Sequence, residues 1–262
     1  MKKLLPLILF SLICSQAWGA TYYVREDGGN NTQCTGLADT PYDGSGSGEA
    51  CAWNHPWWAI KPVSGTIALG ASDTLIIDGT GQNGYQMGIA DGNKTARNAG
   101  ACAMSAAYDC YMQPPPSGTS EGSRTKIYGK GWDTGCANPP ELWGSGRTGR
   151  ILNISGSDNL DVRCLEITDH FQGVYLSGPH PNECRHASPY DQNTGYNGIR
   201  ASGSTNVNLH DVNIHGLCLG GLDTNNLDNW DFTRVTMQGN GFVGWDGDIG
   251  GVGNHDNITL IL

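Results

Sequence analysis

Three charged residues occupy the same place in a short pattern that returns along the chain. Arg200 follows an apolar residue in "GIRASG", and Asp223 and Asp246 do the same in "GLDTNN" and "GWDGD". If these segments are successive turns of a repeating structure, the backbones of the two aspartates lie about 5 Å apart. Adjacent carboxylates repel, so that one takes a proton or a cation joins them. With Asp248 added, the predicted ligand set contains only oxygen, which suits Ca²⁺.

This constellation allows more than one interpretation. Arg200, Asp223 and Asp246 are the residues predicted to be catalytic if the protein is an enzyme. As an acid paired with a base or nucleophile, the two aspartates would suit glycoside hydrolysis. As a surface charge ladder, the three residues would only keep like charges apart. The choice depends on the elements that position them.

Those elements are short strands. "NVNLHDVNIHG" (206–216) alternates apolar and polar residues, which indicates a strand with one buried and one wet face. "WDFTRVTMQG" (230–239) repeats the pattern 23 residues later. Apolar residues of shorter segments are predicted to share one column of the core: Ile151, Val174, Ile199, Leu222 and Trp245.

The period of this repeat predicts the fold. A step in the low twenties with about three short strands per step is typical of a solenoid. The fixed Leu and Asn positions of leucine-rich repeats are missing, as is the six-residue period of left-handed hexapeptide helices. The chain is therefore predicted to be all-β, a single-stranded right-handed parallel β-helix with about 23 residues per coil and long loops.

One coil departs from the pattern, because residues 178–197 lack the expected apolar alternation. We expect a large loop there, and loops on a rigid scaffold are where binding residues concentrate. Tyr175 is expected one coil before Arg200 and is a predicted substrate-binding residue. The loop residues predicted to stack on sugar rings, or else to pack the loop, are His180, His186, Tyr190 and Tyr196.

Other polar and aromatic residues have a simpler interpretation. The column Asp161, Asn208 and Asp231 is predicted to be solvated surface. His210 and His215 alternate outward from one strand, and the absence of a histidine column argues against a metal site there. The tryptophans of "CAWNHPWWAI" are expected to cap the open end of the core: Trp53, Trp57 and Trp58.

Residues 1–20 have the features of a signal peptide. A positive start precedes a short apolar run and small residues, which places the expected cleavage after Gly19 or Ala20. The run is too short to span a bilayer, and no other hydrophobic run is long enough. The mature net charge is 13 − 25 = −12. A charge of this sign argues against nucleic acid or an anionic bilayer as the main partner, but it does not exclude an anionic polysaccharide, because Ca²⁺ can bridge two negative partners.

Eight cysteines remain after the segment is removed, and an even number in an exported chain predicts disulfides. Cys34–Cys51 and Cys102–Cys110 are the expected pairs, because each closes a short loop rich in Gly or Ala. The sequence does not assign the other four. A structural zinc site is not expected, since no C-x-x-C spacing occurs.

Several segments carry a family resemblance. The start "TYYVREDGGNNTQC", then "HPWWAI", "SDTLIIDGTG", "SRTKIYGKG" and "SGSDNLDVRCLEITD", resembles secreted bacterial β-helix proteins of the pectate-lyase-like superfamily. We expect a cap region with long loops over 21–150 and regular coils over 151–262. Because Leu262 falls inside a recognisable copy of the repeat, a continuation beyond it is also expected.

The resemblance implies activity on an extracellular or cell-wall polysaccharide, in the periplasm, at the cell surface or outside the cell. In lyases of this superfamily, Ca²⁺ held by aspartates neutralises a uronate carboxylate and an Arg or Lys takes the C5 proton. Arg200 beside Asp223 and Asp246 resembles that arrangement. The polygalacturonase segments N-T-D, D-D, G-H-G and R-I-K are absent, so hydrolysis ranks lower. A non-catalytic β-helix that binds glycans, as adhesins do, is the other alternative.

Overall fold

The computed structural model describes residues 19–60, 67–79, 84–87, 113–144, 148–169, 195–241, 243–247 and 255–261. Within these ranges the chain forms β-strands and one short 3-10 helix, η1 (Pro56–Trp58). The strands are β1 (Thr21–Gly29), β2 (Thr74–Ile77), β3 (Tyr85–Met87), β4 (Thr125–Gly129), β5 (Glu141–Gly144), β6 (Thr148–Asn153), β7 (Leu160–Asp169), β8 (Gly195–Ser202), β9 (Thr205–His215), β10 (Gly220–Asn225), β11 (Leu227–Thr233), β12 (Thr236–Gln238), β13 (Val243–Asp246) and β14 (His255–Ile261).

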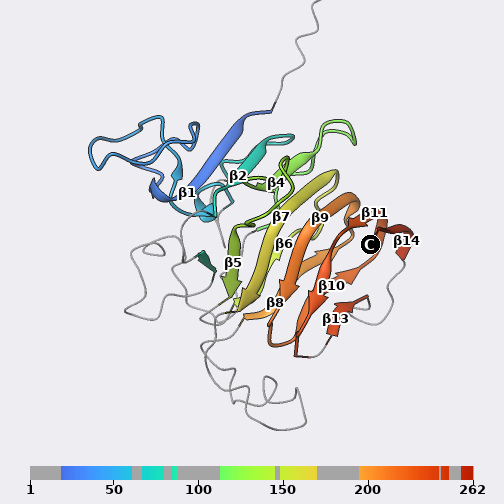
Figure 1. Ribbon diagram of the computed structural model, residues 1–262. Helices are drawn as coiled ribbons and strands as arrows, with labels where there is room; N and C mark the ends of the chain where they lie inside the picture. Colours follow the sequence, from blue (N-terminus) through green and yellow to red (C-terminus); the bar gives the residue numbers. More distant parts are fainter. Residues whose placement is uncertain are drawn as a thin grey trace, which may run out of the picture.

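The strands form two parallel sheets. The larger sheet follows the order β1-β2-β4-β7-β9-β11-β14, with β3, β5 and β12 attached to it. The smaller sheet has the order β13-β10-β8-β6 (Figure 1). Every pairing between named strands in the described ranges is parallel, and strands adjacent in the chain alternate between the two sheets from β6 to β11. The prediction of an all-β fold with parallel strands is confirmed, and the arrangement is consistent with a parallel β-helix.

The longest strands bend at one residue. Cys164, Asp211 and Arg234 follow one another on successive turns, and each has a positive φ of 52–56°. A single left-handed residue changes the direction of the chain. It divides β7, β9 and the β11–β12 segment into a first and a second limb. The first limbs are 160–163, 207–210 and 230–233, and the second limbs are 165–169, 212–215 and 236–238.

An asparagine column marks the corner before the first limbs. Asn159, Asn206, Asn229 and Asn257 precede in-register strand positions, and each has a φ of 53–55°. Asparagine tolerates this left-handed conformation better than other residues with a side chain. The Asn206 side-chain amide also donates to the Asn159 side-chain oxygen, at 3.1 Å. The column therefore repeats one turn geometry on four levels.

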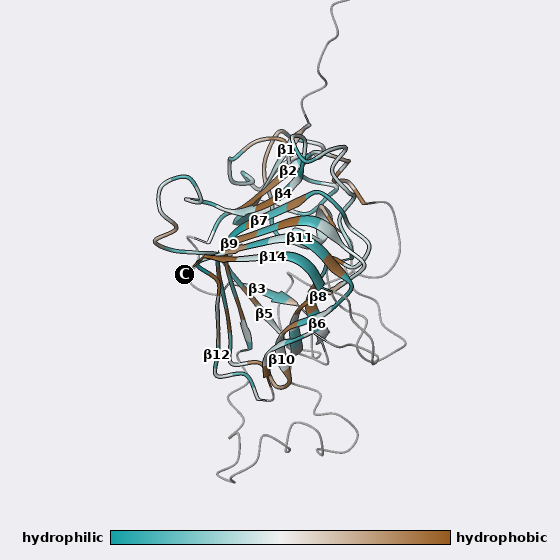
Figure 2. Ribbon diagram, turned by 90° about the vertical axis from the view of Figure 1, so that its right-hand side faces the viewer, coloured by the Kyte–Doolittle hydropathy of each residue, from teal (hydrophilic) through white to brown (hydrophobic). Residues whose placement is uncertain are grey.

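The core consists of stacked apolar side chains, as the opening strand pattern predicts. Val207 pairs with Trp230, Leu209 with Phe232, and Ile214 with Met237. Apolar and polar residues alternate along these strands in Figure 2. The 23-residue step between the two patterns is confirmed.

The predicted apolar column is right in part. Leu222 pairs with Ile199 and with Trp245, but the partner of Ile199 in β6 is Leu152 and not Ile151. Ile151 and Leu152 are both apolar and fully buried, so hydrophobicity alone does not show which of them pairs with Ile199. Val174, predicted for this column, lies outside the described residues.

The step is also longer than predicted in one coil. β6 pairs directly with β8 and β7 directly with β9, so that Leu160 and Val207, 47 residues apart, are on neighbouring levels. These 47 residues therefore make up one coil of the structure and not the two coils that the sequence spacing predicts. The last step, from Trp230 to Ile258, is 28 residues. Coil length varies because only the strand segments must stay in register.

Three glycines keep the smaller sheet close to the rest of the core. Gly198, Gly221 and Gly244 come directly before the inward-facing residues of β8, β10 and β13. A Cβ on Gly198 would lie 2.7 Å from the Ile214 side chain, and one on Gly221 would lie 2.6 Å from the Gly244 carbonyl oxygen. The glycine that opens each segment is therefore a packing requirement.

The N-terminal turns carry the predicted aromatic cap. Trp53 and Trp57 are buried and belong to the core, and Trp58 packs against it. Trp53 stacks on Tyr22 with ring centroids 5.2 Å apart, and its Nε1 donates to the Cys34 carbonyl oxygen. These tryptophans thus pack into the core at its N-terminal end, which supports the interpretation that they cap it.

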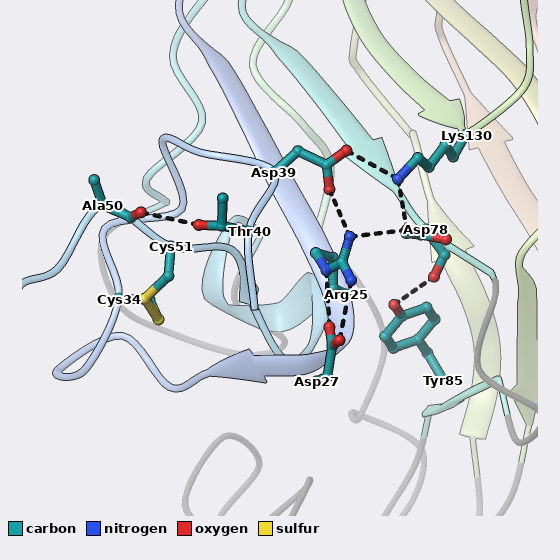
Figure 3. Close-up of polar contacts among 10 residues, drawn as sticks. All are labelled: Arg25, Asp27, Cys34, Asp39, Thr40, Ala50, Cys51, Asp78, Tyr85 and Lys130. Carbon is teal, nitrogen blue, oxygen red and sulfur yellow. Dashed lines mark hydrogen bonds and ion pairs between the residues drawn. A yellow bond between two sulfur atoms is a disulfide. The ribbon is translucent and has the colours of Figure 1, made fainter. Parts of the chain in front are cut away.

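An ion-pair network ties this cap to the first strands (Figure 3). The buried Asp78 carboxylate at the end of β2 lies 2.8 Å from Lys130 Nζ and 3.4 Å from Arg25 Nη1. The Asp39 carboxylate in the cap loop accepts from the same two cations, at 2.9 and 3.2 Å. Two positive groups compensate the buried carboxylate, and removing either one would leave its charge less compensated.

Disulfides follow the prediction where it can be compared. Cys34–Cys51 is confirmed, and Cys136–Cys164 joins two of the cysteines that the sequence leaves unassigned. Cys218 is also disulfide-bonded. The expected Cys102–Cys110 pair lies outside the described residues. In the described part of the chain, no helix is long and apolar enough to cross a membrane.

Candidate functional site

The smaller sheet places the three candidate residues in one row. Arg200 on β8 pairs with Asp223 on β10, which pairs with Asp246 on β13. All three are partly exposed, whereas the adjacent Ile199 and Leu222 are fully buried. The row therefore faces outward on three consecutive levels. Its spacing is the one predicted from the sequence.

Asp223 is the most strongly perturbed member of the row. Burial raises the pKa of its carboxyl, the positive charge of Arg200 lowers it, Asp246 raises it and Arg150 lowers it. The outcome is a pKa of about 6 instead of 3.8. Desolvation therefore outweighs both arginines, and Asp223 ionises close to neutral pH.

Asn197 holds one oxygen of Asp223. Its side-chain Nδ2 donates to Asp223 Oδ2 at 3.3 Å, and its Oδ1 accepts from the Gly220 backbone N–H at 3.1 Å. The backbone contact determines which side of the amide faces the carboxylate. Asn197 thus orients Asp223 and leaves its second oxygen to other partners.

The backbone of Asp246 on β13 is held by a side chain from the neighbouring strand β10. Thr224, fully buried, donates from its hydroxyl to the Asp246 carbonyl oxygen at 3.3 Å. The same hydroxyl accepts from Trp245 Nε1 at 2.7 Å. These contacts attach β13 to β10 and keep Asp246 on the level next to Asp223.

Sequence reasoning misses Arg150 and Asn197. They are in register with each other on β6 and β8. Asn197 donates to the Asp223 carboxylate, and the charge of Arg150 lowers the pKa of that carboxyl. Asn197 precedes Arg200 by three residues, an odd separation that a strict two-residue alternation would put on opposite faces. Gly198 and Ile199 both lie toward the core, which brings Asn197 to the outer face. Only the observed chain path provides this signal.

Several predicted site residues cannot be placed. Tyr175, His180, His186, Tyr190 and Asp248 lie outside the described residues. Tyr196 belongs to β8, but its side chain is not among those described. The position one level before Arg200 is occupied by Asn153 and not by Tyr175.

The predicted calcium ligands are incomplete in the described part of the chain. Asp223 and Asp246 contribute two carboxylates, and no three His, Cys, Asp or Glu side chains described there are grouped to hold a metal. Ca²⁺ takes six to eight oxygens. These two residues alone do not make up a calcium site.

A second polar column differs from its prediction. Asp161, Asn208 and Asp231 are in register as expected, but Asp161 is buried and not solvated. Its carboxylate accepts from the Tyr128 hydroxyl at 2.7 Å and from two Arg163 nitrogens, both at 2.7 Å. Hydrogen bonds to the charged form replace the lost water.

An aromatic pair covers this buried contact. The Tyr128 and Trp132 rings are 4.4 Å apart, and the Arg163 guanidinium lies 5.5 Å from the centroid of each. The Cys136–Cys164 disulfide holds the loop that carries Trp132 against β7. Since every group has a partner, the cluster reads as a structural contact.

Comparison of the chain with models of protein families, with curated proteins and with solved structures finds no match. The pectate-lyase-like resemblance therefore stays a proposal. The candidate site is defined by its own geometry, with these residues: Arg150, Asn197, Arg200, Asp223 and Asp246.

Proposed function

We propose that this protein is an exported carbohydrate-active protein of the pectate-lyase-like kind, which cleaves uronate-containing polysaccharide by β-elimination. One observation carries the proposal: Asp223 lies partly buried and outward-facing, in register between Arg200 and Asp246. The Cys34–Cys51 and Cys136–Cys164 disulfides support an oxidising compartment. The net charge of −10 favours a sugar partner over nucleic acid.

The residues have complementary roles in such a reaction. Arg150 and Arg200 attract the uronate carboxylate, because guanidinium groups match carboxylates in charge and shape. Neutralising that carboxylate makes the neighbouring C5 proton more acidic. Asp223 accepts this proton, and its contact with Asn197 leaves one oxygen to do so. The bond between C4 and its oxygen then breaks as the C4–C5 double bond forms, and the leaving oxygen takes a proton from water.

This assignment differs from the role that the resemblance implies for Arg200. An arginine side chain stays protonated in proteins, and here it has a carboxylate in the next strand. It is therefore better suited to bind an anion than to take a proton. Asp223 is the better acceptor.

Ca²⁺ is a proposed cofactor that the described residues support only in part. Asp223 and Asp246 would hold it, and it would supply additional neutralisation of the uronate carboxylate. No step above depends on it. Activity with and without a chelator tests this part separately.

Retaining glycoside hydrolysis is a second candidate. Asp223 and Asp246 face outward side by side on adjacent strands, and retaining enzymes use two neighbouring carboxyl groups as acid/base and nucleophile. This reaction releases a reducing end without a double bond. It is distinguished from elimination by its product.

The experiment is a panel of uronate polysaccharides incubated with the mature protein, with Ca²⁺ or with chelator. Elimination is expected to give unsaturated ends that absorb in the ultraviolet. Reducing ends without that absorbance indicate hydrolysis. Binding without any product indicates a non-catalytic glycan-binding protein and contradicts the enzymatic proposal.

A further inference from the structure

A hydrogen-bonded row of an acid, an imidazole and a hydroxyl lies on a different sheet from the proposed site. The His215 Nε2 atom lies 2.7 Å from a Glu166 carboxylate oxygen, and its Nδ1 lies 3.3 Å from the Thr168 hydroxyl. Glu166 and Thr168 are on the second limb of β7, and His215 is at the end of β9. None of these residues contributes to the Asp223 environment.

The local fold explains the contact. Thr168 and His215 occupy corresponding positions of neighbouring levels, because Glu166 and Ile167 pair with Asn213 and Ile214. Glu166 precedes Thr168 by two residues and so projects from the same face. The register of one strand pair therefore brings all three groups together.

The direction of the hydrogen bonds follows from the partners. An ionised carboxylate only accepts, so Glu166 requires the proton on His215 Nε2. In the neutral imidazole Nδ1 is then the acceptor, and the Thr168 hydroxyl donates to it. Acid, imidazole and hydroxyl are thus connected in the order used by serine hydrolases.

The Thr168 hydroxyl is less accessible than its two partners. Thr168 is buried, whereas the side chains of Glu166 and His215 are each 31% exposed. Trp143 is the neighbour of Thr168 on the preceding level. On the other side, Gly216 has a φ of +67°, and a Cβ there would lie 3.2 Å from the Thr168 hydroxyl oxygen. A residue with a Cβ at this position would crowd the hydroxyl.

We propose that Thr168, His215 and Glu166 form a second site, which hydrolyses esters with a small acyl group such as acetyl. The Thr168 oxygen attacks the carbonyl carbon, and its proton passes to His215 Nδ1. The carbon–oxygen bond to the alcohol breaks, and the alcohol leaves with that proton. Water then attacks the acyl-threonine, gives a proton to His215 and releases the carboxylic acid while Thr168 regains its proton. Glu166 keeps the imidazole oriented and stabilises its positive charge.

The test measures hydrolysis of p-nitrophenyl acetate and, by intact mass and peptide mapping, transient acetylation of Thr168. Thr168→Val keeps the branched shape and removes the hydroxyl. His210→Gln is the matched control, because His210 also lies on β9 and faces outward but has no part in the row. Melting temperatures show whether each variant is folded.

We expect wild-type turnover and an acetyl adduct on Thr168. Thr168→Val and His215→Gln should lower the rate at least about a hundredfold, the usual range for general acid–base groups. His210→Gln should keep the wild-type rate, and Thr168→Ser should keep the adduct. No hydrolysis above buffer by the wild type, or an unchanged rate in folded Thr168→Val, would overturn the proposal. Either result leaves the polysaccharide reaction at Asp223 untouched.

Discussion

Asn197 donates a hydrogen bond to Asp223 across the β8–β10 strand pair, and the Gly220 backbone N–H fixes the amide that makes it. The contact connects a residue that sequence reasoning overlooks to one that it selects. It also shows that the charge row of the smaller sheet is oriented by neutral neighbours.

The first prediction concerns this contact. In Asn197→Ala the carboxylate of Asp223 loses a donor that favours its charged form, so the pKa of Asp223 should rise further above about 6. Carbon-13 NMR titration of the side-chain carboxyl measures it. Asn208→Ala, on the larger sheet, is the control and should leave the value unchanged. An unaltered titration in Asn197→Ala would contradict the contact.

A second prediction is that ionised Asp223 destabilises the fold. Its pKa is about 6 in the folded state and about 3.9 in an unfolded chain, so the folded state binds more protons between these values. Stability from this group therefore falls as pH rises from about 4 to about 6, and stays lower above that. Asp223→Asn should exceed the wild type in unfolding free energy at pH 7 but not at pH 4. Urea denaturation of both proteins at both pH values measures this. The same difference in unfolding free energy between variant and wild type at pH 4 and at pH 7 would contradict the prediction.

The third prediction concerns the asparagine corner. Asn206→Ala keeps a left-handed residue with a Cβ but loses the amide contact to Asn159, so it should lower the free energy of unfolding by about 1–2 kcal/mol. Asn206→Gly should lose less, because glycine adopts this conformation freely. Urea unfolding of both variants provides the comparison. Equal losses would show that backbone conformation contributes nothing there.

A fourth prediction tests the glycine column. In Gly221→Ala the new Cβ would meet the Gly244 carbonyl oxygen at 2.6 Å, which requires the strands to separate. We expect a loss of about 1–3 kcal/mol, as for other overpacked cores. Gly122→Ala is the matched control, since its nearest neighbour would be 4.0 Å away. Similar thermal stability of the two variants would contradict tight packing.

The strand registers of the larger sheet could be predicted because two signals agree. Val207 and Trp230 stand in a two-residue alternation and are separated by a repeat that recurs elsewhere, so that only one alignment buries both residues. The same argument aligns Arg200 with Asp223. Where period and alternation agree, burial determines the register.

The remainder depends on contacts that these two signals do not contain. Ile151 and Leu152 are both buried, so hydrophobicity cannot decide which one pairs with Ile199. Cys136 and Cys164 meet because a loop folds back over the next level. Asn197 reaches Asp223 because Gly198 and Ile199 both lie toward the core. In each case the deciding factor is the path of the chain between strands.

The account is tested most directly by the rate and affinity of Asp223→Asn on a uronate polysaccharide that the wild type cleaves. The variant keeps the shape of the side chain and both arginines, so it should bind the polymer but form no unsaturated product above background. Asp231→Asn, on the larger sheet, is the control and should cleave at the wild-type rate. Unsaturated product formed by Asp223→Asn at the wild-type rate would contradict the role assigned to Asp223.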